Sequence, residues 1–205
     1  MKDRLPESSD DVQRYESSRY KGLDQRIVHS IEYRISSNLV QDIAQPQDHI
    51  LDIPCGYGRF TAYLVDGPWK VTAADLNQHM LERTRERFAE SAEFSMGSIT
   101  EMPFADGVLD GLFSMRLLQH FHTTDKRTAA FREIRRVITR WAVVSVYSSS
   151  ALHKLMRMFR DHHKITMVDQ SQLNAEIEQS GLRVVERKKI LPGIHAQTIL
   201  LLEPR

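Results

Sequence analysis

A glycine turn between a buried strand and a helix constrains the fold of this chain more than any other feature of its sequence. An apolar segment at 49–53 leads into Gly56 and Gly58, and a helix is expected to follow. A second apolar segment, 69–74, ends at the acid Asp75. Glycine has no Cβ and adopts positive φ readily, so the backbone of such a turn can approach a ligand closely. Strand, glycine turn, helix, strand and acid together predict half of a nucleotide-binding α/β unit.

The chain beyond this unit alternates strand and helix patterns, as a parallel sheet requires. The segment 141–147 is a continuous apolar run of the kind expected for a strand buried on both faces. Asn77 can cap one helix, Thr123, Thr124 or Asp125 can cap another, and Gly181 ends a third. Strands are therefore expected at 49–53, 69–74, 92–96, 109–114, 141–147, 182–190 and 196–202, and helices at 57–65, 78–90, about 124–139 and 169–180.

Two helices are expected before the sheet, within residues 12–44. Apolar residues recur every four positions through the second helix, which predicts a stripe that faces the core. Pro46 ends this helix, because proline disfavours helix in the residue before it. Residues 1–11 are polar and of mixed charge, and we expect them to be frayed. The stripe comprises Ile27, Ile31, Ile35, Leu39 and Ile43, and Val28 widens it.

The composition of the chain limits the classes of protein to which it can belong. With 205 residues, 41% of them hydrophobic, the chain can form one domain with a substantial core. No apolar run approaches the roughly 20 residues of a membrane span, and residues 1–7 lack the apolar region of a secretory signal. The single cysteine, Cys55, cannot form an internal disulfide, which favours a cytoplasmic protein. The net charge of +1 argues against broad binding to nucleic acid.

Four segments resemble the class I S-adenosylmethionine-dependent methyltransferases, in particular small-molecule enzymes with a methyltransferase domain of type 11 or 25. The glycine turn with Asp52 and Asp75 resembles their motifs I and II, and the similarity continues through 97–106, 109–121 and 132–138. The resemblance implies a doubly wound α/β fold with a mostly parallel seven-stranded sheet of order 3-2-1-4-5-7-6. We expect a single domain over 1–205, with a helical lid at 1–45, a cofactor-binding core at 46–147, and acceptor-side helices with a strand hairpin at 148–205.

The resemblance also implies how S-adenosylmethionine is held. Gly56 and Gly58 lie under its amino-acid and ribose parts, with Pro54 and Cys55 in the same turn. Asp52 accepts hydrogen bonds from its ammonium, directly or through water, and Asp75 accepts from both ribose hydroxyls. The family more often has aspartate at the position of Ser98. The remaining expected contacts are Leu76 and Met80 on the adenine, Ser98 and Ile99 at the adenine edge, and Met115 and Arg116 under the methionine part, where Arg116 alternatively contacts the carboxylate.

Other interpretations of these residues remain open. A dinucleotide is disfavoured, because Thr61 stands where an NAD-binding turn has a third small residue and Asp52 has no role in the NAD pattern. Cys55 is interpreted as a small packing residue in preference to a catalytic thiol, since the sequence offers it no obvious base. Met80 fits the core as well as an adenine contact. Asp52 and Asp75 could also be ordinary polar residues at strand ends.

Methyl transfer needs little acid–base chemistry, because the sulfonium is already an activated leaving group. A general base is needed only for an acceptor that is protonated at neutral pH. His120, which follows the fourth strand, is the first candidate for a base or positioning group, with packing or capping as its alternative. His122 is a weaker candidate, and His153, His162, His163 and His195 belong to the expected acceptor-side cover. None of the histidines has a convincing metal-ligand spacing, so no metal is expected.

The sequence therefore predicts methyl transfer from S-adenosylmethionine to a small-molecule acceptor, mainly through proximity and orientation, with S-adenosylhomocysteine as product. The alternatives are an enzyme acting on a lipid or quinone-like acceptor at a membrane surface, and a non-catalytic cofactor-binding or regulatory protein on the same fold. The segment 151–164 predicts a basic amphipathic helix, either packed with a solvated basic face or serving as a lid for an anionic acceptor or a membrane. Tyr15, Arg19 and Tyr20 are expected to reach the cofactor pocket. The acceptor, the methylated atom and the oligomeric state stay open.

Overall fold

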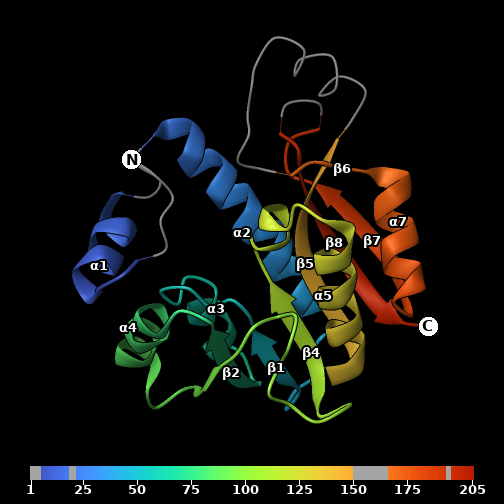
Figure 1. Ribbon diagram of the computed structural model, residues 1–205. Coiled ribbons are helices and arrows are strands. Elements are labelled where there is room, and N and C mark those ends of the chain that lie inside the picture. The colour runs from blue at the N-terminus through green and yellow to red at the C-terminus, as the bar shows by residue number, and fades with distance from the viewer. Residues whose placement is uncertain (1–5, 19–21, 150–165, 193–194) are drawn as a thin grey trace.

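A single mixed sheet organises the chain in a computed structural model that describes residues 6–18, 22–149, 166–192 and 195–205 (Figure 1). The strand order is β3-β2-β1-β4-β5-β8-β7, and β6 pairs with β5 outside this path. The strands are β1 (His49–Asp52), β2 (Lys70–Asp75), β3 (Glu93–Met96), β4 (Leu109–Ser114), β5 (Ile138–Ser149), β6 (Val168–Asp169), β7 (Leu182–Lys189) and β8 (Gln197–Pro204). Arg19, Tyr20, the expected helix at 151–164, and His153, His162 and His163 lie outside the described residues.

The sheet confirms the predicted fold class and strand order. β1 lies between β2 and β4 and is parallel to both, with Asp52 opposite Ala73 on one side and Phe113 on the other. β8 runs antiparallel between β5 and β7, as the predicted hairpin requires. The structure adds the two-residue strand β6 to the predicted set. The strands expected as the sixth and seventh are therefore β7 and β8. The carboxyl ends of β1, β2 and β4 consequently meet at one edge.

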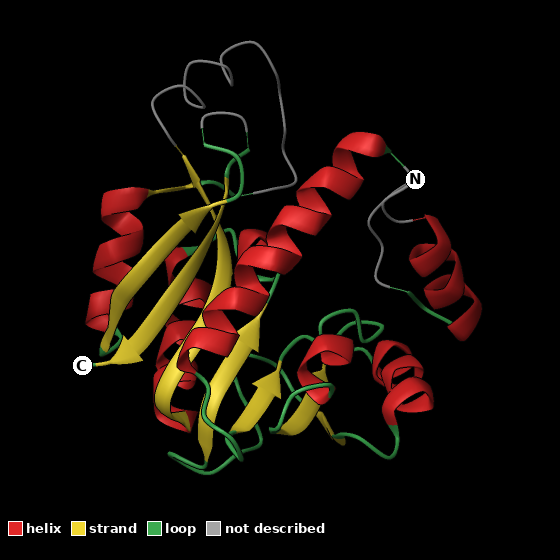
Figure 2. Cartoon of the chain, turned by 180° about the vertical axis from the view of Figure 1, so that it is seen from behind, coloured by secondary structure: helices red, strands yellow, loops and turns green. Residues whose placement is uncertain are grey.

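Helices cover both faces of the sheet (Figures 1 and 2). Alternating strand residues point to opposite faces, and Leu51 and Leu112 pack against one helical layer while Ile50 and Phe113 pack against the other. Figure 2 shows α2 crossing the face opposite to that of α5 and α7. The helices are α1 (Ser9–Ser18), α2 (Leu23–Ile43), α3 (Thr61–Val65), α4 (Gln78–Phe88), α5 (Thr124–Val137) and α7 (Gln170–Gln179), with a short 3-10 helix at Leu118–His120. None of the helices in the described part of the chain is long and apolar enough to cross a membrane.

The start of the chain differs from the prediction of a frayed terminus up to residue 11. Helix α1 begins at Ser9, and Pro6 is buried. The Asn77 side-chain amide donates to the Pro6 carbonyl at 2.9 Å, and Arg83 of α4 pairs with Glu16 of α1 at 3.0 Å. These contacts to α4, which lies beside α1 in Figure 1, order residues 6–18 in spite of their polar composition.

The buried face of α2 is also displaced from the predicted apolar stripe. Ile27, the first residue of the stripe, is 56% exposed, whereas Glu32 and Ser36 are fully buried. The Ser36 hydroxyl donates to the Glu32 carbonyl at 2.8 Å, which satisfies that hydroxyl inside the helix. Burial of a carboxylate requires charged or hydrogen-bonding partners, and those of Glu32 come from the site described below. The four-residue spacing of the apolar residues therefore predicted the helix, but it did not predict that Glu32 and Ser36 are fully buried.

Candidate active site

A cavity of about 420 Å³ opens at the carboxyl ends of β1, β2 and β4. Ligands of open α/β sheets bind at this edge, where neighbouring connections run to opposite faces. The predicted residues that line the cavity are Pro54, Cys55, Gly56, Asp75, Leu76, Met80, Ser98, Ile99, Met115, Arg116 and His120. Most of the site residues predicted from the sequence therefore line one cavity. Of the predicted cofactor-binding residues, Asp52 and Gly58 do not line it.

The glycine turn is built on two residues with positive φ. Gly56 has φ 58° and Gly58 has φ 82°. A Cβ on Gly58 would lie 2.7 Å from Cε2 of Phe88, so this glycine is required by packing against α4. A Cβ on Gly56 would meet nothing within 4 Å, and Gly56 lines the cavity. The turn therefore leaves open the space that a closely bound ligand would fill.

Asp75 is held at the mouth of this space by backbone donors. The N–H of Gly56 donates to Oδ2 at 2.9 Å, and the N–H of Asn77 donates to Oδ1 at 2.8 Å. Burial raises the pKa of the Asp75 carboxyl, although the same backbone donors act in the opposite direction. A carboxylate offers about four acceptor positions, so two oxygens can still accept from a vicinal diol. The residues present fit the ribose of S-adenosylmethionine.

Asp52 lies beneath the turn and not in the cavity wall. Only 2% of it is exposed, and the Thr61 hydroxyl donates to its Oδ2 at 2.6 Å. Burial raises the pKa of this carboxyl to about 7, with a further contribution from the nearby Asp75 and opposition from Thr61 and Arg59. The sequence interpretation gave Asp52 a direct or water-mediated contact to an ammonium. Because Asp52 lies behind the residues that line the cavity, we expect its contact with a bound ammonium to run through a water molecule.

The adenine side of the cavity is mostly apolar. Met80 and Ile99 are buried in its wall, whereas Leu76 is 66% exposed and presents a surface that a ring could cover. The Ser98 hydroxyl is engaged locally: it lies 2.9 Å from the Thr100 hydroxyl and accepts from the Thr100 N–H at 3.3 Å. Ser98 is therefore a weaker acceptor for an adenine amino group than an aspartate would be.

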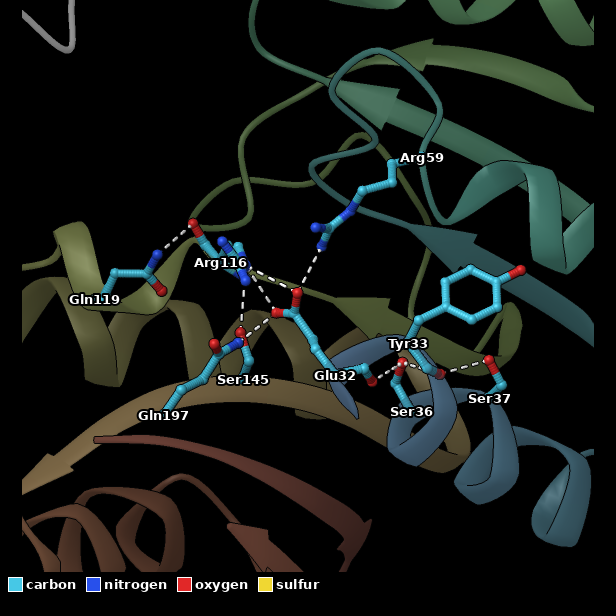
Figure 3. Close-up of polar contacts among 9 residues, drawn as sticks. All are labelled: Glu32, Tyr33, Ser36, Ser37, Arg59, Arg116, Gln119, Ser145 and Gln197. Carbon is cyan, nitrogen blue, oxygen red and sulfur yellow. Dashed lines mark hydrogen bonds and ion pairs between the residues drawn. The ribbon is translucent and has the colours of Figure 1, made fainter. Parts of the chain in front are cut away.

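The opposite wall holds an ion-pair cluster that the sequence interpretation missed (Figure 3). The Arg116 Nε donates to both carboxylate oxygens of Glu32, at 2.8 and 2.9 Å, and the Arg59 guanidinium donates at 3.0 Å. Gln197 of β8 also donates to Glu32. Burial alone would raise the pKa of Glu32, but the two arginines and these hydrogen bonds hold it below its ordinary value. The sequence did contain one signal of this cluster, because Glu32 is a charged residue among the apolar residues of α2 that face the core.

Aromatic and imidazole groups complete the lining of the cavity. Tyr15 of α1 lines it, as predicted, with its ring 6.2 Å from that of Tyr57. His120 is exposed at the cavity wall beside Phe121. His122 and His195 do not line the cavity. Instead, His122 Nδ1 lies 2.6 Å from the Thr166 hydroxyl, and the ring of His195 lies 5.6 Å from that of Tyr147.

Cys55 is suited to packing and not to nucleophilic chemistry. Its side chain is buried, and that burial raises the pKa of the thiol, with the neighbouring carboxylates of Asp52 and Asp75 adding to the effect. The thiolate is the reactive form of cysteine. The environment of Cys55 therefore favours the unreactive thiol.

The two glycines of the turn should respond differently to the same substitution. For Gly58→Ala we expect a loss of stability of about 1 to 2 kcal/mol, because the new Cβ meets Phe88 and the residue keeps a left-handed backbone. For Gly56→Ala we expect a smaller loss of stability but a roughly tenfold loss of cofactor affinity, since its Cβ enters the open space of the cavity. Thermal unfolding and calorimetric titration measure the two effects. Equal cofactor affinity for Gly56→Ala and wild type would contradict the assignment of this space to a ligand.

Comparison with solved structures identifies the fold. Over 97% of the chain, the fold matches that of magnesium protoporphyrin IX methyltransferase from Synechocystis PCC 6803, solved with bound S-adenosylhomocysteine, with a TM-score of 0.78, 14% identity and 96% of that chain covered. A protein from Pyrococcus horikoshii OT3 matches with a TM-score of 0.72 and 17% identity, over 90% of this chain and 93% of that one. The chain thus has the fold of the class I methyltransferases.

Sequence comparison points to the same class over part of the chain. Residues 50–140 match the methyltransferase domain family, and this match together with the fold implies S-adenosylmethionine as the cofactor. The O-methyltransferase cnsE of Penicillium expansum is 25% identical over 158 residues, 72% of this chain and 56% of that protein. A demethylmenaquinone methyltransferase of Symbiobacterium thermophilum is 37% identical over 76 residues, 33% of this chain and 30% of that protein. The chain spans 27% of a bifunctional biotin biosynthesis protein of Cellvibrio japonicus, at 27% identity over 140 residues and 65% of this chain.

Proposed function

We propose that this chain transfers a methyl group from S-adenosylmethionine to a small-molecule acceptor. The observation that carries the proposal is the open cavity between Gly56 and Asp75, at the sheet edge where this fold binds its ligands. Asp75 would accept from the ribose diol, Gly56 would lie under the bound cofactor, and Leu76 and Met80 would pack on the adenine. The family match over residues 50–140 supports the same assignment.

Catalysis would come mainly from positioning. The cofactor supplies an activated methyl group on its sulfonium, and an acceptor atom held in line at about 3 Å needs no further activation if it is already nucleophilic. His120 is exposed at the cavity wall, where it can orient an acceptor or take a proton from a hydroxyl acceptor. Tyr15 and Tyr57 would limit access of water from the side of α1.

The acceptor is proposed to be a small molecule with an apolar or aromatic part. Leu117 and Phe121, which are close to His120 in the chain, and Tyr57 contribute apolar surface to the cavity. Relatives that cover part of the chain are O-methyltransferases of fungi and a bacterial demethylmenaquinone methyltransferase. These names support a small aromatic or quinone-like acceptor. The membrane-surface alternative depended on residues 151–164, which lie outside the described part of the chain.

The first test is calorimetric titration of wild-type protein with S-adenosylmethionine and, separately, with NAD. We expect binding of S-adenosylmethionine in the micromolar range and none of NAD. Methyl transfer is then tested with radiolabelled cofactor against phenols, quinols and carboxylic acids of small size. Binding of NAD in place of S-adenosylmethionine would refute the assignment of the glycine turn. Cofactor binding without turnover of any acceptor would favour a regulatory protein.

A further inference from the structure

A buried ion pair joins α5 to α7, which lie side by side on one face of the sheet (Figure 1). Nε and Nη2 of Arg127 donate to the two carboxylate oxygens of Glu176, at 2.8 and 2.5 Å. The two side chains are only 4% and 3% exposed. Apolar side chains of similar volume are often at least as stabilising as a buried ion pair, because both charges lose their hydration, so stability alone is a weak explanation for its presence.

The third nitrogen of the Arg127 guanidinium reaches the segment that forms the cavity wall. Nη1 donates to the carbonyl of Phe121 at 3.0 Å, and Phe121 lines the cavity. Nη2 donates to the Thr124 hydroxyl at 3.2 Å as well as to Glu176. The guanidinium is planar, so its N–H groups point in fixed directions relative to one another. The carboxylate of Glu176 therefore sets the direction of the N–H that holds the Phe121 carbonyl.

Phe121 is the residue at which the chain leaves the short 3-10 helix Leu118–His120. It is extended, with φ −91° and ψ 98°. Carbonyl groups at the end of a helix need partners from outside the helix. Here the partner is a cation, and hydrogen bonds from ionised donors are shorter and stronger than neutral ones. Arg127, near the start of α5, thus holds the end of the 3-10 helix in place.

The main chain around His120 is held from both sides. The carbonyl of Gln119 accepts from the N–H of Thr166, just before β6, at 2.9 Å. On the other side, the carbonyl of Phe121 accepts from Arg127. His120 is exposed and lines the cavity together with Phe121. The position of both side chains in the cavity wall therefore depends on donors that come from other parts of the fold.

We propose that Arg127, held by Glu176, is a positioning residue that places His120 and Phe121 for the acceptor. The proposal rests on the proposed methyl-transfer function and adds to it a residue outside the cavity. Arg127 does not line the cavity, so it acts through the carbonyl of Phe121. Transfer by proximity requires the acceptor atom in line with the methyl group, and small displacements are costly. Loss of this hydrogen bond should therefore lower turnover and leave cofactor binding intact.

Two variants remove the contact in different ways. Arg127→Met/Glu176→Met replaces the whole pair by apolar side chains, which avoids leaving a carboxylate buried without its charged partner. Arg127→Lys keeps a charge for Glu176 but lacks the planar fork, so it should fold even if the double variant does not. A purely structural ion pair would make Arg127→Lys behave like wild type, whereas a positioning role predicts a loss in both variants.

Arg140→Met is the matched control. Arg140 likewise pairs with a carboxylate, that of Asp48 at 2.6 Å, and donates to a main-chain carbonyl, that of Ile43 at 3.1 Å. Asp48 directly precedes β1, so this pair lies at the amino end of the strand, away from the cavity at its carboxyl end. The control thus removes an arginine with the same kinds of contact and leaves the cavity wall untouched.

The first measurement is methyl transfer from radiolabelled S-adenosylmethionine to the phenol, quinol or carboxylic acid that wild-type protein turns over fastest. We expect both Arg127 variants to lose about tenfold or more in kcat/KM for this acceptor. Their affinity for S-adenosylmethionine in calorimetry should stay within about twofold of wild type. Arg140→Met should keep both values, although thermal unfolding is expected to show that it is less stable than wild type.

The second measurement, amide hydrogen exchange, needs no acceptor. The N–H groups of His120 and Phe121 close the 3-10 helix by donating to carbonyls three residues earlier, at 2.9 and 3.1 Å. Without the contact from Arg127 these two amides should exchange about tenfold faster, because the segment opens more often. The amide of Ile53, which donates to a carbonyl of β4 at 2.9 Å, should exchange at the wild-type rate.

Lower turnover with faster exchange of the two amides, at unchanged cofactor affinity, supports the positioning role. The proposal is overturned if folded Arg127 variants keep the wild-type kcat/KM or the wild-type exchange rates. It is equally overturned if Arg140→Met loses as much turnover, since general destabilisation would then explain both losses. If wild-type protein turns over no acceptor, the proposed function fails, and the exchange rates alone then decide whether Arg127 holds the segment.

Discussion

Asp75→Ala is expected to weaken S-adenosylmethionine binding by at least about 2 kcal/mol, roughly thirtyfold. This is the loss expected when charge-assisted hydrogen bonds to a ribose diol are removed. The substitution also leaves the N–H groups of Gly56 and Asn77 without their carboxylate acceptor. Those donors shape the turn on which the cofactor would lie. Both effects act in the same direction, so Asp75 should be the most sensitive position in the cavity.

Calorimetric titration of wild type, Asp75→Ala and Asp75→Asn measures this loss. Asp125→Asn is the matched control, because Asp125 is an exposed acid at the start of α5, away from the cavity. A second ligand, 5′-methylthioadenosine, keeps the ribose diol but lacks the amino-acid part. Asp75→Ala should weaken the binding of both ligands. Unchanged affinity of folded Asp75→Ala for both ligands would refute the ribose assignment.

The half of the cavity around Asp75 was predictable from sequence because its residues are close together along the chain. Gly56 follows the parallel strand β1 and Asp75 ends the parallel strand β2, and strand ends in this fold converge at one edge. The local sequence pattern and this one rule of topology were therefore sufficient to predict the part of the cavity formed by Gly56 and Asp75. The resemblance to the methyltransferase family added Ser98 and Met115, which follow the neighbouring strands β3 and β4 and line the cavity.

The ion-pair cluster around Glu32 was not predictable in this way, because it joins residues far apart in the sequence. Glu32, Arg116 and Gln197 come from α2, the end of β4 and β8. Helical periodicity assigned the core face of α2 to its isoleucines, yet Glu32 is more buried than Ile27. A charged residue is placed there only when its partners are known. Periodicity carries no information about partners from other segments.

Stability should fall as pH rises through neutrality because of Asp52. Its carboxyl has a pKa of about 7 in the folded chain, against an ordinary value of 3.8. Between these pH values the folded state holds a proton that the unfolded state has released. The free energy of unfolding therefore decreases with rising pH over this window. From pH 5 to pH 8 the decrease attributable to Asp52 is about 2 to 3 kcal/mol.

Urea unfolding of wild type and Asp52→Asn at pH 5 and pH 8 isolates this contribution, because other titrating groups are common to both proteins. Asparagine keeps an oxygen that can accept from the Thr61 hydroxyl, so the variant should fold. The wild type should lose more stability than the variant between the two pH values. Equal losses would show that Asp52 is ionised throughout the range.

The same carboxyl offers a test of its proposed role toward the ammonium of the cofactor. A cation that comes near Asp52, even through water, favours the ionised form and lowers the pKa of the carboxyl. Binding of S-adenosylmethionine near pH 6.5 should then release a proton from wild type and not from Asp52→Asn. Calorimetry in two buffers of different ionisation enthalpy measures that release. Proton release that is equal in both proteins would place the ammonium elsewhere, and Asp52 would then act only through the packing of the glycine turn.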